Sequence, residues 1–161
     1  MIDIQPRSTL LSAHFSLGEL THTAHANIDN SPSDEIVYQL QLLCTRYLEP
    51  LRTQFGPLWV SSGYRCPKLN ALIGGVPDSA HIFGCAADLV PMASGVTVTQ
   101  MVAWLATSGL DYDQIIDEGA GEVAWCHIGM LRPGFETAPR RECLTYRNGL
   151  YTPFQQPTQG A

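Results

Sequence analysis

Three side chains in the middle of the sequence, His81, Asp88 and His127, form a possible metal-binding set. Asp88 interrupts the apolar stretch 86–90, where a carboxylate is costly to bury unless it is paired or binds a metal. His127 lies in a predicted strand, with Trp125 on the same face because side chains alternate along a strand. Two imidazoles and a carboxylate, with a fourth position left for water, are typical of a catalytic zinc site. A buried ion pair for Asp88 and a hydrogen-bonded core position for His127 are the alternatives.

The segments that must position these side chains are helices in the first half of the chain and short strands in the second. The pattern S-x-x-E at residues 16–19 and the pattern T-x-x-Q at residues 97–100 are capping boxes, which predict helix starts. Helices are expected at residues 17–21, 32–55, 67–72 and 98–107, and strands at residues 58–62, 85–90, 112–117, 123–130, 141–146 and 150–151. This order predicts an α+β fold with a small antiparallel sheet.

Length and charge limit the class of protein. The chain has 161 residues and a mass of 17.6 kDa, which suits one domain with its own hydrophobic core. We expect this domain over residues 1–151, acting as a monomer, and a poorly ordered tail over residues 152–161. The net charge of −6 argues against nucleic-acid binding and against adhesion to anionic membranes.

The sequence also bears on the compartment in which the chain is made. The N-terminus lacks a basic segment followed by an apolar stretch, so we expect no secretory signal peptide. No run of about 18 apolar residues is present, so no membrane-spanning segment is expected. The five cysteines show no C-x-x-C spacing, which favours reduced thiols in a protein made in the cytosol.

Three short motifs surround the candidate metal ligands in a fixed order. They are S-G-Y-R-C-P at residues 62–67, S-A-H followed by D at residues 79–88, and W-C-H at residues 125–127. Their order and spacing resemble the zinc D-Ala-D-Ala carboxypeptidase family, whose signatures are S-G-Y-R-x-P, S-x-H-x6-D and W-x-H. The resemblance covers roughly residues 14–146. That family includes bacterial cell-wall carboxypeptidases and phage endolysins, and it shares the fold of the hedgehog signalling domain.

The resemblance implies a role for each matching residue. It implies that one zinc ion per chain is held by His81, Asp88 and His127. It also implies that Arg65 contacts the substrate or the developing oxyanion, because a fixed guanidinium suits either charge. A surface ion pair is the alternative for Arg65.

Three further residues are expected near the substrate. Tyr64 and Trp125 are predicted to wall the site, although both are also suited to the core. Ser79 precedes the first ligand histidine, and we expect it to support the site or cap a turn rather than to act as a nucleophile.

A zinc peptidase also needs a general base that takes a proton from water. Relatives carry a glutamate shortly before the last histidine, at the end of the preceding strand. Glu118 follows a strand that resembles the family segment, so it is the favoured base. Glu122 begins the next strand and is the alternative.

The resemblance therefore implies a zinc peptidase that cleaves peptidoglycan stem peptides, as a D-Ala-D-Ala carboxypeptidase or an endolysin-type endopeptidase. Without a signal peptide, such a protein would reach the cell wall at phage lysis or as part of a virion. A non-catalytic zinc-binding module is the alternative, because hedgehog uses this fold mainly for binding. A non-haem iron oxygenase is disfavoured, because its carboxylate usually follows the first histidine by two residues rather than seven.

Overall fold

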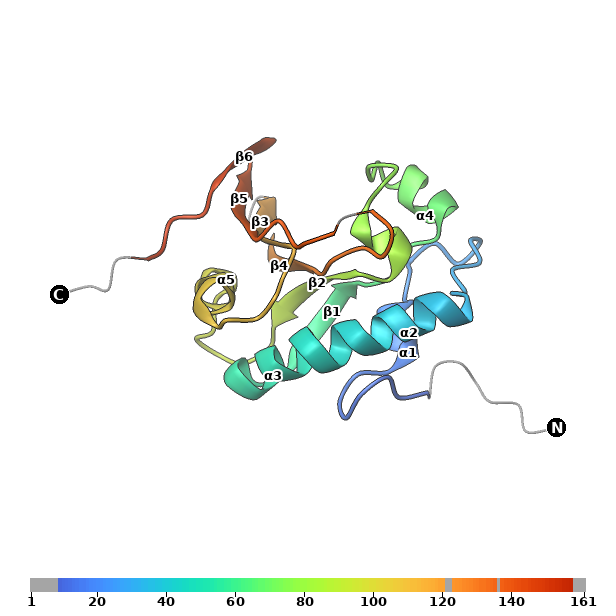
Figure 1. Cartoon of the computed structure of the whole chain (residues 1–161), viewed down its shortest axis with the longest axis horizontal. Helices are drawn as coiled ribbons and strands as arrows, with labels where there is room; N and C mark the ends of the chain where they lie inside the picture. Colours follow the sequence, from blue (N-terminus) through green and yellow to red (C-terminus); the bar gives the residue numbers. More distant parts are fainter. Residues whose placement is uncertain (1–8, 121–122, 136, 158–161) are drawn as a thin grey trace.

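The computed structural model describes residues 9–120, 123–135 and 137–157 of the chain. A six-stranded sheet forms its centre, and most of the helices lie against one face of this sheet (Figure 1). The predicted α+β class is therefore confirmed.

The helices lie close to the predicted segments. They are α1 (Leu17–Leu20), α2 (Asp34–Leu43), the π-helical turn η2 (Cys44–Leu48), α3 (Glu49–Phe55), α4 (Pro67–Leu72), the 3-10 turn η3 (Ala80–Phe83) and α5 (Val98–Thr107). Both predicted capping boxes are present, at the starts of α1 and α5.

The predicted long helix differs at its start and in its middle. It begins at Asp34 with Ser33 as N-cap, two residues later than predicted, and the Ser31 N–H instead donates a hydrogen bond to the Asp29 side chain. Its middle widens into the π-helical turn η2 just before Pro50. Proline has no N–H and its ring crowds the carbonyl four residues earlier, so a regular α-helical turn is disfavoured there.

The strands form one sheet with the order β1-β2-β4-β3-β5-β6. Their bounds are β1 (Leu58–Ser62), β2 (Ala86–Pro91), β3 (Gln114–Ala120), β4 (Val123–Gly129), β5 (Glu142–Arg147) and β6 (Leu150–Pro153). All pairs are antiparallel except β3 with β5. The connection over residues 130–141 carries the chain past β3, so β5 runs in the same direction as β3.

The C-terminal segment is more structured than expected. Strand β6 reaches Pro153, and the N–H of Phe154 donates a hydrogen bond to the Cys143 carbonyl. The beginning of the predicted tail over residues 152–161 is therefore part of the sheet, whereas residues 158–161 lie outside the described residues.

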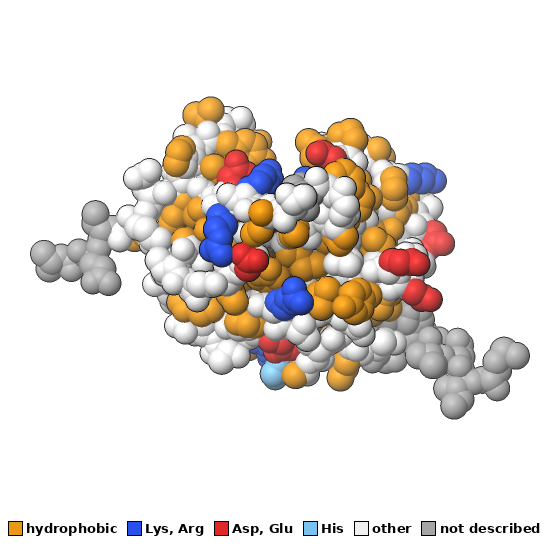
Figure 2. Space-filling model, in the orientation of Figure 1, with side chains coloured by type: hydrophobic (Ala, Val, Ile, Leu, Met, Phe, Trp, Pro, Cys, Tyr) orange, Lys and Arg blue, Asp and Glu red, His pale blue; other side chains and the backbone are white. Residues whose placement is uncertain are grey.

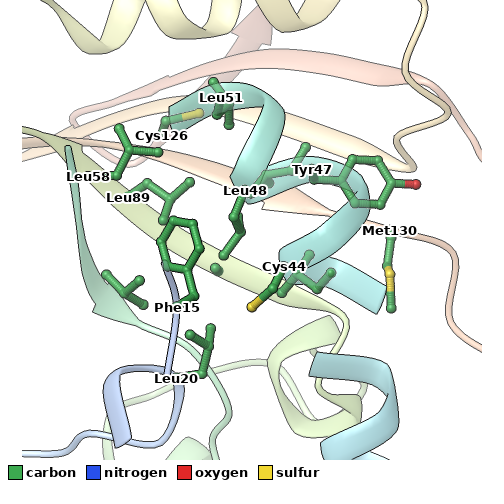
Figure 3. Close-up of a cluster of buried hydrophobic side chains, with 14 of the residues drawn as sticks. Phe15, Leu20, Cys44, Tyr47, Leu48, Leu51, Leu58, Leu89, Cys126 and Met130 are labelled. Atoms are coloured by element: carbon green, nitrogen blue, oxygen red, sulfur yellow. The ribbon is translucent and has the colours of Figure 1, made fainter. Parts of the chain in front are cut away.

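The hydrophobic core lies between the sheet and the helices. Alternation along the strands directs Leu89, Cys126 and Ile128 toward the helices, where all three are fully buried. Figure 3 shows Leu89 and Cys126 packed with Leu48 and Leu51 of the long helical segment. The opposite face of the same strands is free to carry polar side chains, and it does so at Asp88 and His127, described below.

Truncating a central core side chain should destabilise the whole domain. Leu48 is fully buried, so Leu48→Ala removes apolar contacts and leaves a cavity, which should lower the free energy of unfolding by about 2–5 kcal/mol. Leu72→Ala, at an exposed position of α4, should change it by less than about 0.5 kcal/mol. Urea denaturation of both variants measures the free energy of unfolding. Equal decreases in the two variants would show that Leu48 is not a central core residue.

No helix in the described ranges is long and apolar enough to cross a membrane.

Candidate metal centre

The three predicted ligands lie together on the face of the sheet that the helices leave open. One potential ligand atom from each of His81, Asp88 and His127 lies within 4.8 Å of the others. Asp88 Oδ1 is 2.9 Å from His127 Nδ1 and 3.4 Å from His81 Nε2. The cluster is thus centred on one carboxylate oxygen that faces two imidazole nitrogens.

Strand register brings two of these side chains together. Asp88 on β2 is directly opposite His127 on β4, so both side chains point to the same face. His81 comes from η3, and the chain then turns at Gly84, which has φ +66°. A Cβ at Gly84 would also lie 2.9 Å from the Ile36 carbonyl oxygen, so only glycine permits this turn.

A backbone contact fixes the orientation of His81. Its Nδ1 lies 2.7 Å from the carbonyl oxygen of Gly63, which can only accept a hydrogen bond. Nδ1 therefore carries the proton, and Nε2 keeps a lone pair directed at the cluster. Gly63 itself must be glycine, because a Cβ there would lie 2.3 Å from the Leu20 carbonyl oxygen.

The cluster favours an ionised Asp88. Burial alone would raise the pKa of its carboxyl, but the electrostatic interactions with His81 and the hydrogen bond with His127 outweigh burial and hold the pKa well below its usual range. Burial has the opposite effect on His81, lowering its pKa so that the ring favours the neutral form, which is the form that binds metal.

Arg65 forms an ion pair, as its alternative interpretation expected, but with Asp88 of the cluster and at a mostly buried position rather than on the surface. Its Nη2 donates to Asp88 Oδ2 at 2.9 Å, and its Nε donates to Ser62 Oγ at 2.9 Å. The Asp88 carboxylate thus presents one oxygen to the histidines and the other to Arg65. This arrangement holds the guanidinium in a fixed orientation beside the cluster.

The cluster opens into a cleft of about 380 Å³. Most of residues 74–80 lie on one side of it, and Tyr151 of β6 lies on the other. Figure 2 shows a notch between the lobe of α4 and the lobe of β5 and β6, in the orientation of Figure 1. Arg65 and Glu118 both line this cleft together with the three candidate ligands.

Glu118 is positioned by β3, which continues to Ala120 rather than ending at the glutamate. Its side chain shares a face with that of Ile116, which is opposite His127 in the register. Burial raises the pKa of the Glu118 carboxyl, while the charge of His127 and a hydrogen bond with Trp125 oppose that shift. Glu122, the alternative base, lies outside the described residues.

The other predicted substrate residues have different positions. Tyr64 is 7% exposed and packs in the hydrophobic core, in agreement with its alternative interpretation. Trp125 is directly opposite Glu118 in the register, so its side chain lies on the same face as the candidate base. Ser79 lines the cleft at the start of η3, where its side chain makes no capping hydrogen bond.

Sequence reasoning missed several cleft residues, namely Asp78, Gln114, Arg132, Arg140 and Tyr151. Only Tyr151 had a signal, because the Asn148-Gly149 turn predicts a hairpin that ends near it. Gln114 lies on β3, and Arg132 and Arg140 lie in the connection before β5, whereas Asp78 lies in the loop before η3.

The donor set fits a zinc ion. Zinc binds imidazole nitrogens and carboxylate oxygens, and a catalytic site uses three protein ligands with one open position. The orientation of His81 by a backbone carbonyl is the kind of contact that fixes a metal-binding imidazole. The opening of the cluster into the cleft leaves room for a fourth ligand.

Comparison with known families agrees with this chemistry. A family model described as peptidase M15 matches residues 13–117, which is more than half of the chain. No curated protein matches the sequence. The match includes His81 and Asp88 and ends before Glu118 and His127, which the sheet brings beside them. M15 peptidases are zinc-dependent hydrolases. The extent of this match shows that the chain belongs to the peptidase M15 family.

Proposed function

We propose that this protein is a zinc peptidase that hydrolyses peptide bonds in peptidoglycan stem peptides, with its zinc held by His81, Asp88 and His127. One observation carries the proposal: the three candidate ligands, a carboxylate and a fixed guanidinium line the same cleft. A binding module needs the ligands alone, whereas hydrolysis also needs a base and a group that stabilises negative charge. Glu118 and Arg65 supply these two functions.

Each residue has a distinct task in this proposal. A bound zinc ion supplies a Lewis acid that activates water and polarises the peptide carbonyl. Glu118 accepts the proton of the attacking water, for which its carboxylate must be ionised. Arg65, held by Asp88 and Ser62, presents a positive charge toward the oxygen that becomes negative in the transition state. Trp125, directly opposite Glu118 on β4, lies beside it on the same face of the sheet.

The bond cleaved is that of a D-Ala-D-Ala carboxypeptidase or of an endolysin-type endopeptidase within the stem. The cleft is walled by the loop over residues 74–80 and by the β5–β6 hairpin, so these two segments contact the residues on either side of the scissile bond. We propose that peptidoglycan is the macromolecular partner and that the protein acts on it as a monomer.

Digestion of purified peptidoglycan tests the proposed activity. The protein should release soluble fragments with new amino groups, and mass spectrometry of these fragments identifies the bond. A chelator should abolish release, and added zinc should restore it, because the reaction requires the metal. The assay is repeated on walls of several chemotypes, because the composition of the stem peptide differs between them. Protein that contains zinc and yet releases no new amino group from any wall would support a non-catalytic module.

A further inference from the structure

A second groove lies on the other side of β1 from the cleft. Its volume is about 930 Å³, and α1, the segment over residues 21–34 and the edge strand β1 form its walls. Among the described residues, none lines both this groove and the metal cleft. The groove is therefore a separate site, within the size range of small-ligand pockets.

The lining of the groove has a distinct chemistry. Trp59 of β1 lines it with a side chain that is 55% exposed, which is unusual for the largest apolar residue. The polar part of the lining consists of small hydroxyl-bearing residues, three carboxylates, one amide and one imidazole, at Ser16, Thr21, Thr23, Ser31, Glu19, Asp29, Asp34, Asn30 and His22. No lysine or arginine lines the groove within the described part of the chain. The groove thus disfavours phosphates and other anions.

Two of the carboxylates already have local partners. Glu19 accepts hydrogen bonds from the N–H and the hydroxyl of Ser16, and Asp29 accepts one from the N–H of Ser31. These bonds hold the two carboxylates in place, so the groove presents an aromatic surface beside fixed hydrogen-bond acceptors. An exposed aromatic ring next to such acceptors suits the face of a sugar ring, which is apolar, and its hydroxyl groups, which donate hydrogen bonds.

Hydrogen bonds of Asn30 connect the groove to a segment near the metal centre. Asn30 in its wall donates hydrogen bonds to the carbonyls of Thr21 and Tyr64 and accepts one from the N–H of Cys66. It therefore ties the groove to the segment that carries Arg65. Trp59 is opposite Val90, two residues along β2 from Asp88 and on the same face, a distance of about 7 Å along the strand.

We propose that this groove binds the glycan strand of peptidoglycan, with Trp59 stacking on a sugar ring. The proposal rests on the proposed function, in which the stem peptide occupies the cleft. A stem peptide is covalently attached to the glycan, so the glycan must lie on a surface near the cleft when the peptide is bound. The Trp59 groove offers an aromatic surface beside carboxylate and hydroxyl acceptors near the cleft. Binding there would raise the local concentration of stem peptides at the metal centre.

Direct binding measurements test the proposal without any turnover. The probes are N-acetylglucosamine tetramers and glycan strands from which an amidase has removed the peptides. The full-length protein should bind both, and tryptophan fluorescence or NMR titration should give the affinity. Trp59→Ala should weaken binding at least about tenfold, which is about 1.4 kcal/mol. Trp59→Phe should restore part of the loss, because it keeps an aromatic ring. Tyr38→Ala, at an exposed aromatic residue of α2 that does not line the groove, should bind like the wild type.

Hydrolysis assays then separate this inference from the proposed function. Trp59→Ala should cleave isolated stem peptides at the wild-type rate and intact walls with a higher KM. The inference is overturned if the wild type binds neither probe, or if Trp59→Ala binds as tightly as the wild type. It is also overturned if the groove binds an amine-bearing cross-bridge peptide in place of the sugars. If the protein binds the glycan probes but cleaves no wall, the proposed function is contradicted and the glycan groove is not.

Discussion

Glu118→Gln should lower the rate of peptide hydrolysis at least about 100-fold, the smallest effect typical of losing a general base. Glutamine keeps the shape of the side chain but cannot accept the proton of the attacking water. Because Glu118 is not one of the clustered ligands, the variant should fold normally and retain its zinc. The rate is measured on wall fragments, with zinc content and circular dichroism recorded on the same samples.

Glu122→Gln is the matched comparison, since Glu122 is the other glutamate that sequence spacing allows as the base. It should change the rate little. If Glu122→Gln loses activity while Glu118→Gln keeps it, the base lies after β3 and the role given to Glu118 is wrong. A Glu118→Gln variant that loses zinc as well as activity would make Glu118 a ligand.

Replacing either ligand histidine should abolish both zinc binding and hydrolysis. His81→Ala and His127→Ala each leave two of the three protein ligands, and a catalytic zinc site uses three. Metal analysis should therefore fall from one zinc per chain to nearly none. A ligand that binds only the folded state stabilises it by about 2.7 kcal/mol at a concentration 100 times its Kd. A chelator should accordingly lower the Tm of the wild type and leave the Tm of the variants unchanged.

His14→Ala provides the control for these variants. His14 is an exposed histidine paired with Glu49, and it is not part of the cluster. This variant should keep one zinc per chain, full activity and the chelator-dependent change in Tm. If His81→Ala and His127→Ala also keep one zinc per chain, the metal is held elsewhere.

The candidate ligands could be predicted from sequence because local patterns single them out. Asp88 places a carboxylate in an apolar strand, and period-two alternation puts His127 on the face opposite Cys126. Both inferences need only the neighbouring residues. His81 could be named from the sequence as well, and its position depends on the turn at Gly84.

The walls of the cleft could not be predicted in the same way because they depend on long-range pairing. Tyr151 reaches the cleft only because β5 runs parallel to β3 and carries β6 beside it. A connection that passes over a neighbouring strand leaves no periodic signal in the sequence. The ion pair between Arg65 and Asp88 likewise depends on the pairing of β1 with β2. The sequence alone therefore allowed a surface position for Arg65 as an alternative.

The same limit applies to Tyr64 and to the π-helical turn. The motif places Tyr64 next to Arg65, and only the fold shows that the tyrosine side chain enters the core. The helical spacing of apolar residues continues through η2, so the change in winding before Pro50 is not visible in the pattern. It follows from the missing N–H of the proline, which sequence reasoning did not weigh.

X-ray diffraction from crystals of the purified protein, measured on both sides of the zinc absorption edge, tests the metal centre most directly. The structure predicts one anomalous peak per chain, about 2.0–2.2 Å from His81 Nε2, Asp88 Oδ1 and His127 Nδ1. A peak at any other group of residues, or no peak between these three atoms in zinc-loaded protein, would contradict the assignment of this cluster as a zinc site.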